Sequence, residues 1–105
     1  MKKIVTVDPR AKNELGKFNE KVRFQIDSLV FILKTEGRLS FPQGKKIGSK
    51  LFEIRIKVGG EYRGLYAYLN KDGIVILHFF QKKTQKTPIE SIRLAEKRLK
   101  DYEQN

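Results

Sequence analysis

The chain has 105 residues, with 23 lysines and arginines against 12 aspartates and glutamates, and its net charge is +11. This length predicts one domain over residues 1–105, and the charge favours a polyanion such as nucleic acid as partner over the alternative of a merely well-solvated basic domain. The absence of cysteine and the single histidine exclude disulfides and zinc sites built on cysteines or several histidines. Without a long apolar run, we expect a soluble, cytoplasmic protein that avoids membranes.

The first third of the chain predicts a strand followed by two helices. Residues 4–7 form a short apolar strand, and Asp8-Pro9 then supplies an N-cap and a first-turn proline. Gly16 interrupts this helix, and Asn19 can cap a second one. The second helix has apolar residues at three- and four-residue spacing before a terminating glycine: Val22, Ile26, Leu29, Val30, Leu33 and Gly37. Because the connection is short, the two helices should form an antiparallel hairpin.

The middle of the chain predicts a loop and then three antiparallel strands. Residues 37–50 contain a proline and several glycines, which indicates a loop. Alternating apolar and polar residues predict strands over 51–58, 61–70 and 74–82. Gly59-Gly60 and Asp72-Gly73 each indicate a two-residue hairpin turn, so the strands should form a meander.

The C-terminal segment predicts a helix that runs to about Tyr102. Thr87-Pro88-Ile89-Glu90 has the pattern of a capping box with proline at the first helical position. Apolar residues then follow along one side of the helix: Ile89, Ile92, Ala95, Leu99 and Tyr102. The element order is β-α-α-β-β-β-α, which is typical of an α+β domain with its short first strand beside the meander.

The two predicted turns set a strand register and therefore predict which side chains share a face of the sheet. Ile56 should pair with Arg63, and Arg63 with Lys82. Leu65 then lies opposite Phe80 and Ala67 opposite His78, on the face that carries Arg63 and Lys82. The other face should carry the remaining cations and tyrosines of these strands, namely Arg55, Lys57, Tyr62, Tyr66 and Tyr68.

The predicted chemistry rests on cations, because carboxylates are few on these strands and no P-loop or other common catalytic motif is present. Arg63 beside Lys82 would form a phosphate clamp, and adjacent aromatic rings can stack on unpaired bases. Structural alternatives remain open for each group. Arg63 and Arg55 could simply pair with Glu61 and Glu53, the lysines after residue 81 could be solvated, and His78, Phe79 and the tyrosines could belong to the core.

Three segments resemble a known family of toxins. L-F-E-I-R-I at residues 51–56, Y-R at 62–63 and I-L-H-F-F-Q-K-K-T-Q-K-T-P at 76–88 resemble the phage-derived HigB-like branch of the RelE/ParE superfamily. The resemblance covers nearly the whole chain, and the K-K-T-Q-K-T-P run is its most specific part. It implies a helical hairpin packed on a small twisted antiparallel sheet. It also implies the toxin of a type II toxin–antitoxin pair that cleaves messenger RNA on the ribosome and inhibits translation.

The implied partners are mRNA, the ribosome and a co-encoded antitoxin. The antitoxin is expected to be a HigA-like helix-turn-helix protein, and the toxin would contact DNA only indirectly, through it. We expect metal-independent cleavage, without a cofactor, in which the RNA's 2′-hydroxyl attacks the adjacent phosphate. Rival functions are a ParE-like gyrase inhibitor and a non-catalytic nucleic-acid-binding module. The candidate catalytic residues are Arg63, Lys82, Lys83 and His78, and the candidate RNA-binding residues are Lys45, Lys46, Arg55, Lys57, Lys86 and Phe80.

Overall fold

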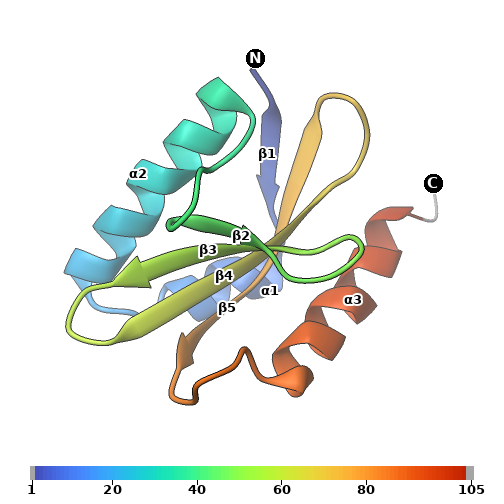
Figure 1. The fold of residues 1–105 in the computed structure, drawn as a ribbon. Helices are drawn as coiled ribbons and strands as arrows, with labels where there is room; N and C mark the ends of the chain where they lie inside the picture. Colours follow the sequence, from blue (N-terminus) through green and yellow to red (C-terminus); the bar gives the residue numbers. More distant parts are fainter. Residues whose placement is uncertain (1, 104–105) are drawn as a thin grey trace.

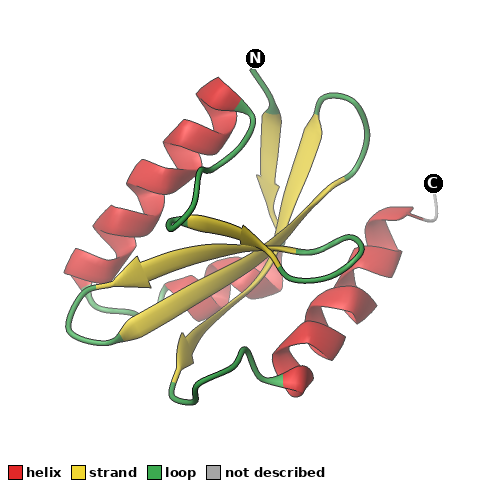
Figure 2. Ribbon diagram, viewed as in Figure 1, coloured by secondary structure: helices red, strands yellow, loops and turns green. Residues whose placement is uncertain are grey.

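A computed structural model describes residues 2–103 and shows a twisted five-stranded sheet with helices on both of its faces (Figures 1 and 2). The strands are β1 (Ile4–Val7), β2 (Gly44–Lys46), β3 (Phe52–Lys57), β4 (Glu61–Tyr68) and β5 (Gly73–Lys82). The helices are α1 (Pro9–Leu15), α2 (Glu20–Glu36) and α3 (Ile89–Glu103). Within residues 2–103, no helix is long and apolar enough to cross a membrane.

The strands lie in the order β1-β5-β4-β3-β2, and the sheet is mixed. The three long strands form the predicted antiparallel meander, and β1 adds to its edge in parallel with β5. Strand β2 lies inside the segment that the sequence predicted to be a loop, and it pairs antiparallel with β3 at the opposite edge. The α+β prediction is therefore confirmed, with one additional short strand between α2 and the meander.

The predicted caps of α1 and α2 are confirmed. The Asp8 side chain accepts a hydrogen bond from the Arg10 N–H and caps α1, with proline in the first turn. Asn19 caps α2 in the same way through Val22 N–H, at 3.0 Å. Gly37 ends α2 with φ of 81°, a left-handed conformation that glycine adopts without steric cost.

Two apolar clusters hold the layers together, one on each face of the sheet. Helix α2 lies to the left of the sheet in Figure 1 and packs Val22, Ile26 and Leu33 against it. Helix α3 lies to the right and packs Ala95 and Leu99 against the other face. The predicted burial of Tyr62, Tyr66 and Phe79 is confirmed, as these side chains join the α2-side cluster. Ile89, which begins the predicted apolar side of α3, is 62% exposed.

The predicted strand register is wrong at both connections. A three-residue loop, rather than a two-residue turn, joins β3 to β4, because Lys57 pairs with Glu61. The connection from β4 to β5 is also longer than predicted, since Tyr68 pairs with Ile74. A bulge follows in β5, where His78 lies opposite Leu65 but Ile76 lies opposite the next residue of β4. The shift of one residue between β3 and β4 moves Arg55 and Lys57 to the face of Arg63. Between β4 and β5 the shift at Arg63 is two residues, so His78, Phe80 and Lys82 stay on that face as predicted.

Candidate nucleic-acid interface

A groove of about 410 Å3 lies on the α3 side of the sheet and is lined by most of the predicted cations. We call it the basic groove. It contains six cations and, among the described residues that line it, one carboxylate. Its lining residues are Lys45, Lys46, Ile47, Glu53, Arg55, Arg63, Lys82, Gln85, Lys86, Thr87 and Ile92. Such an excess of positive charge in a concave surface concentrates polyanions.

The corrected register brings the two central arginines of this groove together. Arg55 of β3 lies directly opposite Arg63 of β4, so the two residues share a face of the sheet. The sequence-based register had placed them on opposite faces. Neighbouring side chains on paired strands are held about 4.5–5.5 Å apart at Cβ. Two guanidinium groups are therefore presented side by side, with Lys82 following on the same face one pair further along.

Arg63 is a buried arginine with a fixed guanidinium group, since it is only 2% exposed. Its Nη2 donates to Glu61 Oε1 at 2.6 Å and its Nη1 to the Tyr62 carbonyl oxygen at 3.1 Å. Its buried Nε has no hydrogen-bond partner and lies 3.7 Å from Glu53 Oε1. The predicted alternative of pairing with Glu61 is thus confirmed, but these contacts also hold the side chain in place at the groove wall.

Glu53 lies at the base of the groove and is 3% exposed. Its Oε1 is 3.7 Å from the Nε of both Arg55 and Arg63, and its Oε2 accepts a hydrogen bond from the Thr87 hydroxyl. Helix α3 begins at Ile89, so Pro88 directly precedes it and Thr87, which was predicted to cap the helix, lies one residue too early. A carboxylate, which can accept a proton, is therefore placed among the cations of the groove.

Lysines from two different edges form the rim of the groove. Lys45 and Lys46 come from β2, and Lys82 and Lys86 come from the end of β5 and the segment that leads to α3. Lys82 Nζ donates to the carbonyl oxygen of Gln85, another residue of the lining, at 2.6 Å. Lys46 is exposed, with its Nζ 5.8 Å from the centre of the Phe52 ring.

Four predicted site residues lie outside the lining of the groove as described for residues 2–103: Lys57, Lys83, Phe80 and His78. Lys83 is exposed in the segment after β5. Phe80 is half-buried, packs against the α3-side core and stacks on the His78 ring with 5.1 Å between centroids. His78 itself is 8% exposed. Its environment matches the core alternative considered for it.

His78 belongs to a buried polar cluster that covers the part of β5 beyond β1. Its Nδ1 lies 2.9 Å from Glu14 Oε1, which also accepts from the backbone N–H of Phe79. Arg98 of α3 contacts both Glu14 oxygens at 3.0 Å and donates to the Leu77 carbonyl oxygen at 2.8 Å. Burial acts to raise the pKa of Glu14, but hydrogen bonds from Arg98 and His78 outweigh it and leave that pKa lowered. These contacts satisfy backbone groups of an otherwise open strand edge.

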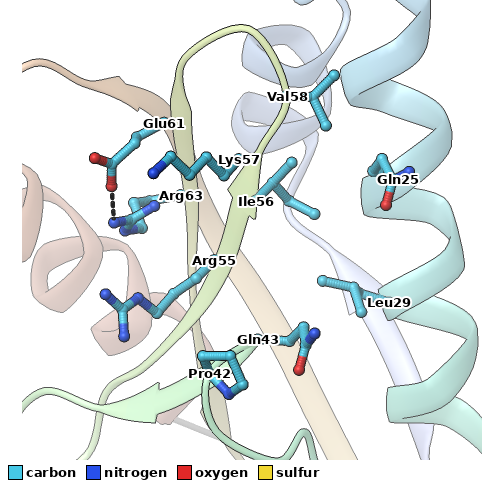
Figure 3. Close-up of a pocket in the computed structure, with 10 residues that line it drawn as sticks. All are labelled: Gln25, Leu29, Pro42, Gln43, Arg55, Ile56, Lys57, Val58, Glu61 and Arg63. Carbon is cyan, nitrogen blue, oxygen red and sulfur yellow. Dashed lines mark hydrogen bonds and ion pairs between the residues drawn. The ribbon is translucent and has the colours of Figure 1, made fainter.

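A second cavity, of about 460 Å3, lies between α2 and the exposed end of β3 (Figure 3). We call it the side pocket. It contains the predicted residue Lys57 and shares Arg55 and Arg63 with the basic groove, so the two arginines separate the two hollows. Its lining residues are Gln25, Leu29, Pro42, Gln43, Arg55, Ile56, Lys57, Val58, Glu61 and Arg63.

Sequence reasoning missed the side pocket and the position of Glu53. From the sequence, Glu53 was considered only as an ion-pair partner of Arg55, although both belong to the L-F-E-I-R-I motif. Gln25 and Gln43 carried no signal, because single glutamines on a helix and in a loop are ordinary solvated residues. Among residues 2–103, no group of three or more His, Cys, Asp or Glu is arranged to hold a metal ion.

Comparison with known proteins gives a family and a fold. A family model described as phage-derived protein Gp49-like matches residues 13–100. A free-state E. coli toxin RelE with two arginines replaced by alanine is 18% identical, with a TM-score of 0.66 over 96% of this chain and 98% of that one. The toxin–antitoxin complex RelBE2 from Mycobacterium tuberculosis contains a chain that is 21% identical, with a TM-score of 0.62 over 78% of this chain and 100% of that one.

A further RelE structure gives the same result. The isolated E. coli RelE toxin is 20% identical, with a TM-score of 0.61 over 87% of this chain and 96% of that one. No curated protein sequence matches the chain. At these identities the structural likenesses establish the fold alone, and that fold is the one seen in RelE toxins.

Proposed function

Because the chain belongs to the family of phage-derived Gp49-like proteins and has the RelE toxin fold, we propose that it is the toxin of a type II toxin–antitoxin system. Its activity is ribosome-dependent cleavage of messenger RNA in the cytoplasm, which inhibits translation. The observation that carries this proposal is the basic groove, where six cations surround one buried carboxylate. Phosphate binding and acid–base chemistry are thereby combined in one concave site.

The cleavage uses the RNA's own 2′-hydroxyl as nucleophile. Glu53 accepts the 2′-hydroxyl proton as the 2′-oxygen attacks the adjacent phosphorus, and the bond from phosphorus to the 5′-oxygen breaks. A lysine of the groove, Lys82 or Lys86, donates a proton to the departing 5′-oxygen. The products are a 2′,3′-cyclic phosphate and a 5′-hydroxyl. The step needs no protein nucleophile and no metal, and His78 serves the structural cluster with Glu14 instead.

The two arginines stabilise the negative charge that develops on the phosphate. Arg63 is buried and held by Glu61 and Tyr62, so its donors need little reorganisation during the reaction. Removal of one such preorganised donor typically costs about 10²- to 10³-fold in rate. The ribosome supplies the remaining requirement, since it holds the messenger in an orientation that allows in-line attack.

A co-encoded antitoxin is the proposed protein partner. The structures of RelBE2 and of the intact E. coli RelBE are toxin–antitoxin complexes. With a net charge of +11, this chain is suited to an antitoxin with an acidic binding surface, which accelerates association. We propose a HigA-like helix-turn-helix protein, which would also provide the toxin's indirect link to DNA.

The proposal is tested with purified protein and ribosomes programmed with a defined messenger. The expected result is cleavage that leaves 5′-hydroxyl ends, and its loss in Arg63→Ala. Arg38→Ala is the matched control, because Arg38 is exposed and lies outside the described lining of the groove. An intact messenger with the parent protein, or equal cleavage by Arg63→Ala, would contradict the proposal.

A further inference from the structure

Phe41 is a large aromatic side chain that is exposed beside the cationic site. It is 73% exposed and lies in the segment between α2 and β2. The Arg55 guanidinium carbon lies 5.6 Å from the centre of its ring. An aromatic ring held against a guanidinium group offers a flat surface of the kind that stacks on an unpaired base.

The position of Phe41 connects it with both hollows. The next residue, Pro42, lines the side pocket, and Arg55 lines both that pocket and the basic groove. Figure 3 shows Pro42 and Gln43 on the same side of the pocket as Arg55. If Arg55 and Arg63 bind a phosphate of the RNA, the nucleotide that carries this phosphate would therefore lie at the entrance to the side pocket.

The side pocket has the chemistry that a nucleobase needs. Leu29 and Pro42 give it apolar walls, whereas the amides of Gln25 and Gln43 provide both donors and acceptors (Figure 3). Single-stranded RNA is recognised by stacking of splayed bases on flat side chains and by hydrogen bonds to their edges. Phe24 and Phe31 on α2 are similarly exposed, at 68% and 64%, but lie outside the described lining of both hollows.

We propose that Phe41 and the side pocket form a base-binding subsite. One unpaired base of the RNA stacks on Phe41 and presents its edge to the glutamines, while its phosphate lies in the basic groove. This inference rests on the proposed function and specifies how the substrate is contacted. The protein binds the base of a nucleotide on one side of the arginine pair and its phosphate on the other. The subsite would also determine which base is preferred at one position of the cleavage site.

The test uses the fact that the chain contains no tryptophan. Phe41→Trp introduces a single tryptophan at the subsite, and Phe31→Trp is the matched control on an exposed position of α2. Each variant is titrated with a short single-stranded RNA and with an abasic ribose-phosphate oligomer of equal length. We expect RNA to quench the emission of Phe41→Trp, the abasic oligomer to leave it nearly unchanged, and Phe31→Trp to respond to neither.

Affinity and base preference complete the test. Phe41→Ala should bind the RNA about tenfold more weakly, which corresponds to the loss of one stacked base, and should bind the abasic oligomer as the parent does. Gln25→Leu should change the base that is preferred at one position of the mapped cleavage sites.

Four results would overturn the subsite. Equal quenching of Phe41→Trp by both oligomers would mean that only the backbone is bound, and a response to the antitoxin alone would assign Phe41 to that partner. RNA binding by Phe41→Ala at parental strength would refute the subsite while leaving the proposed function intact. A parent that neither binds RNA nor cleaves it on ribosomes would instead remove the proposed function and the subsite together.

Discussion

Replacing Glu53 with glutamine should separate RNA binding from RNA cleavage. Glutamine keeps the size of the side chain and an acceptor for the Thr87 hydroxyl, but it cannot accept the 2′-hydroxyl proton. Loss of a general base typically lowers a rate by about 10²- to 10⁴-fold. We therefore expect Glu53→Gln to cleave messenger on ribosomes at least about 100-fold more slowly than the parent.

The affinity of Glu53→Gln for RNA should not fall with its cleavage rate. Glu53 is the only carboxylate among the described residues that line the groove, so its neutralisation removes repulsion of the phosphate. Two like charges 4 Å apart repel by about 1 kcal/mol in bulk water and about 4 kcal/mol near a protein surface. Even the smaller value corresponds to roughly fivefold tighter binding. The affinity for a short RNA should therefore rise or stay constant while cleavage falls.

The assay compares Glu53→Gln with Glu61→Gln. Glu61 also pairs with Arg63, at 2.6 Å, but it lines the side pocket instead of the basic groove. Glutamine at position 61 keeps an oxygen that accepts from Arg63 Nη2, so Glu61→Gln should hold Arg63 in place and retain cleavage. Thermal unfolding would confirm that both variants are folded. If Glu53→Gln cleaved as fast as the parent, Glu53 would not be the base. A parallel loss of binding and cleavage would show that Glu53 only holds the arginines in place.

Three further predictions concern the arginine pair and the fold. Arg63→Lys should slow cleavage by about 10²-fold but leave the salt dependence of RNA binding unchanged, because it loses the fork of donors and keeps the charge. Gly64→Ala should lower the free energy of unfolding by about 1–3 kcal/mol, measured by denaturant titration, whereas Gly48→Ala should have little effect. A Cβ at Gly64 would lie 2.6 Å from the Phe79 ring, and one at Gly48 meets nothing within 4 Å. The pKa of Glu14 is lowered in the folded state, so its contribution to stability is present above the ordinary glutamate pKa and is lost as pH falls below it. In acid, the free energy of unfolding should therefore fall less steeply with pH for Glu14→Gln than for the parent.

The parts of the fold that local chemistry determines could be predicted from the sequence. Asp8, Asn19 and Gly37 each end or begin a helix through contacts within a few residues. The alternation of residues 52–57 likewise identified β3. The cations of the groove were also found, because lysines and arginines on one sheet are a strong signal of polyanion binding.

The strand register could not be predicted, because it depends on contacts between distant segments. Gly59-Gly60 has the composition of a two-residue turn, yet the loop begins one residue earlier and shifts the pairing of β3 with β4. The bulge in β5 is stabilised by Glu14 and Arg98, which bind its backbone from helices far away in the sequence. A two-residue periodicity contains no information about such partners, so Arg55 and Arg63 were separated in the prediction although they are neighbours.

The most direct test of the central claim is to map messenger 5′ ends in cells after induced expression of the parent and of Glu53→Gln. The parent should produce new 5′-hydroxyl ends within translated messages and arrest protein synthesis before any DNA damage. Glu53→Gln should produce neither effect. Intact messages accompanied by trapped gyrase–DNA complexes would contradict the claim, since the basic groove would then not be a site of RNA cleavage.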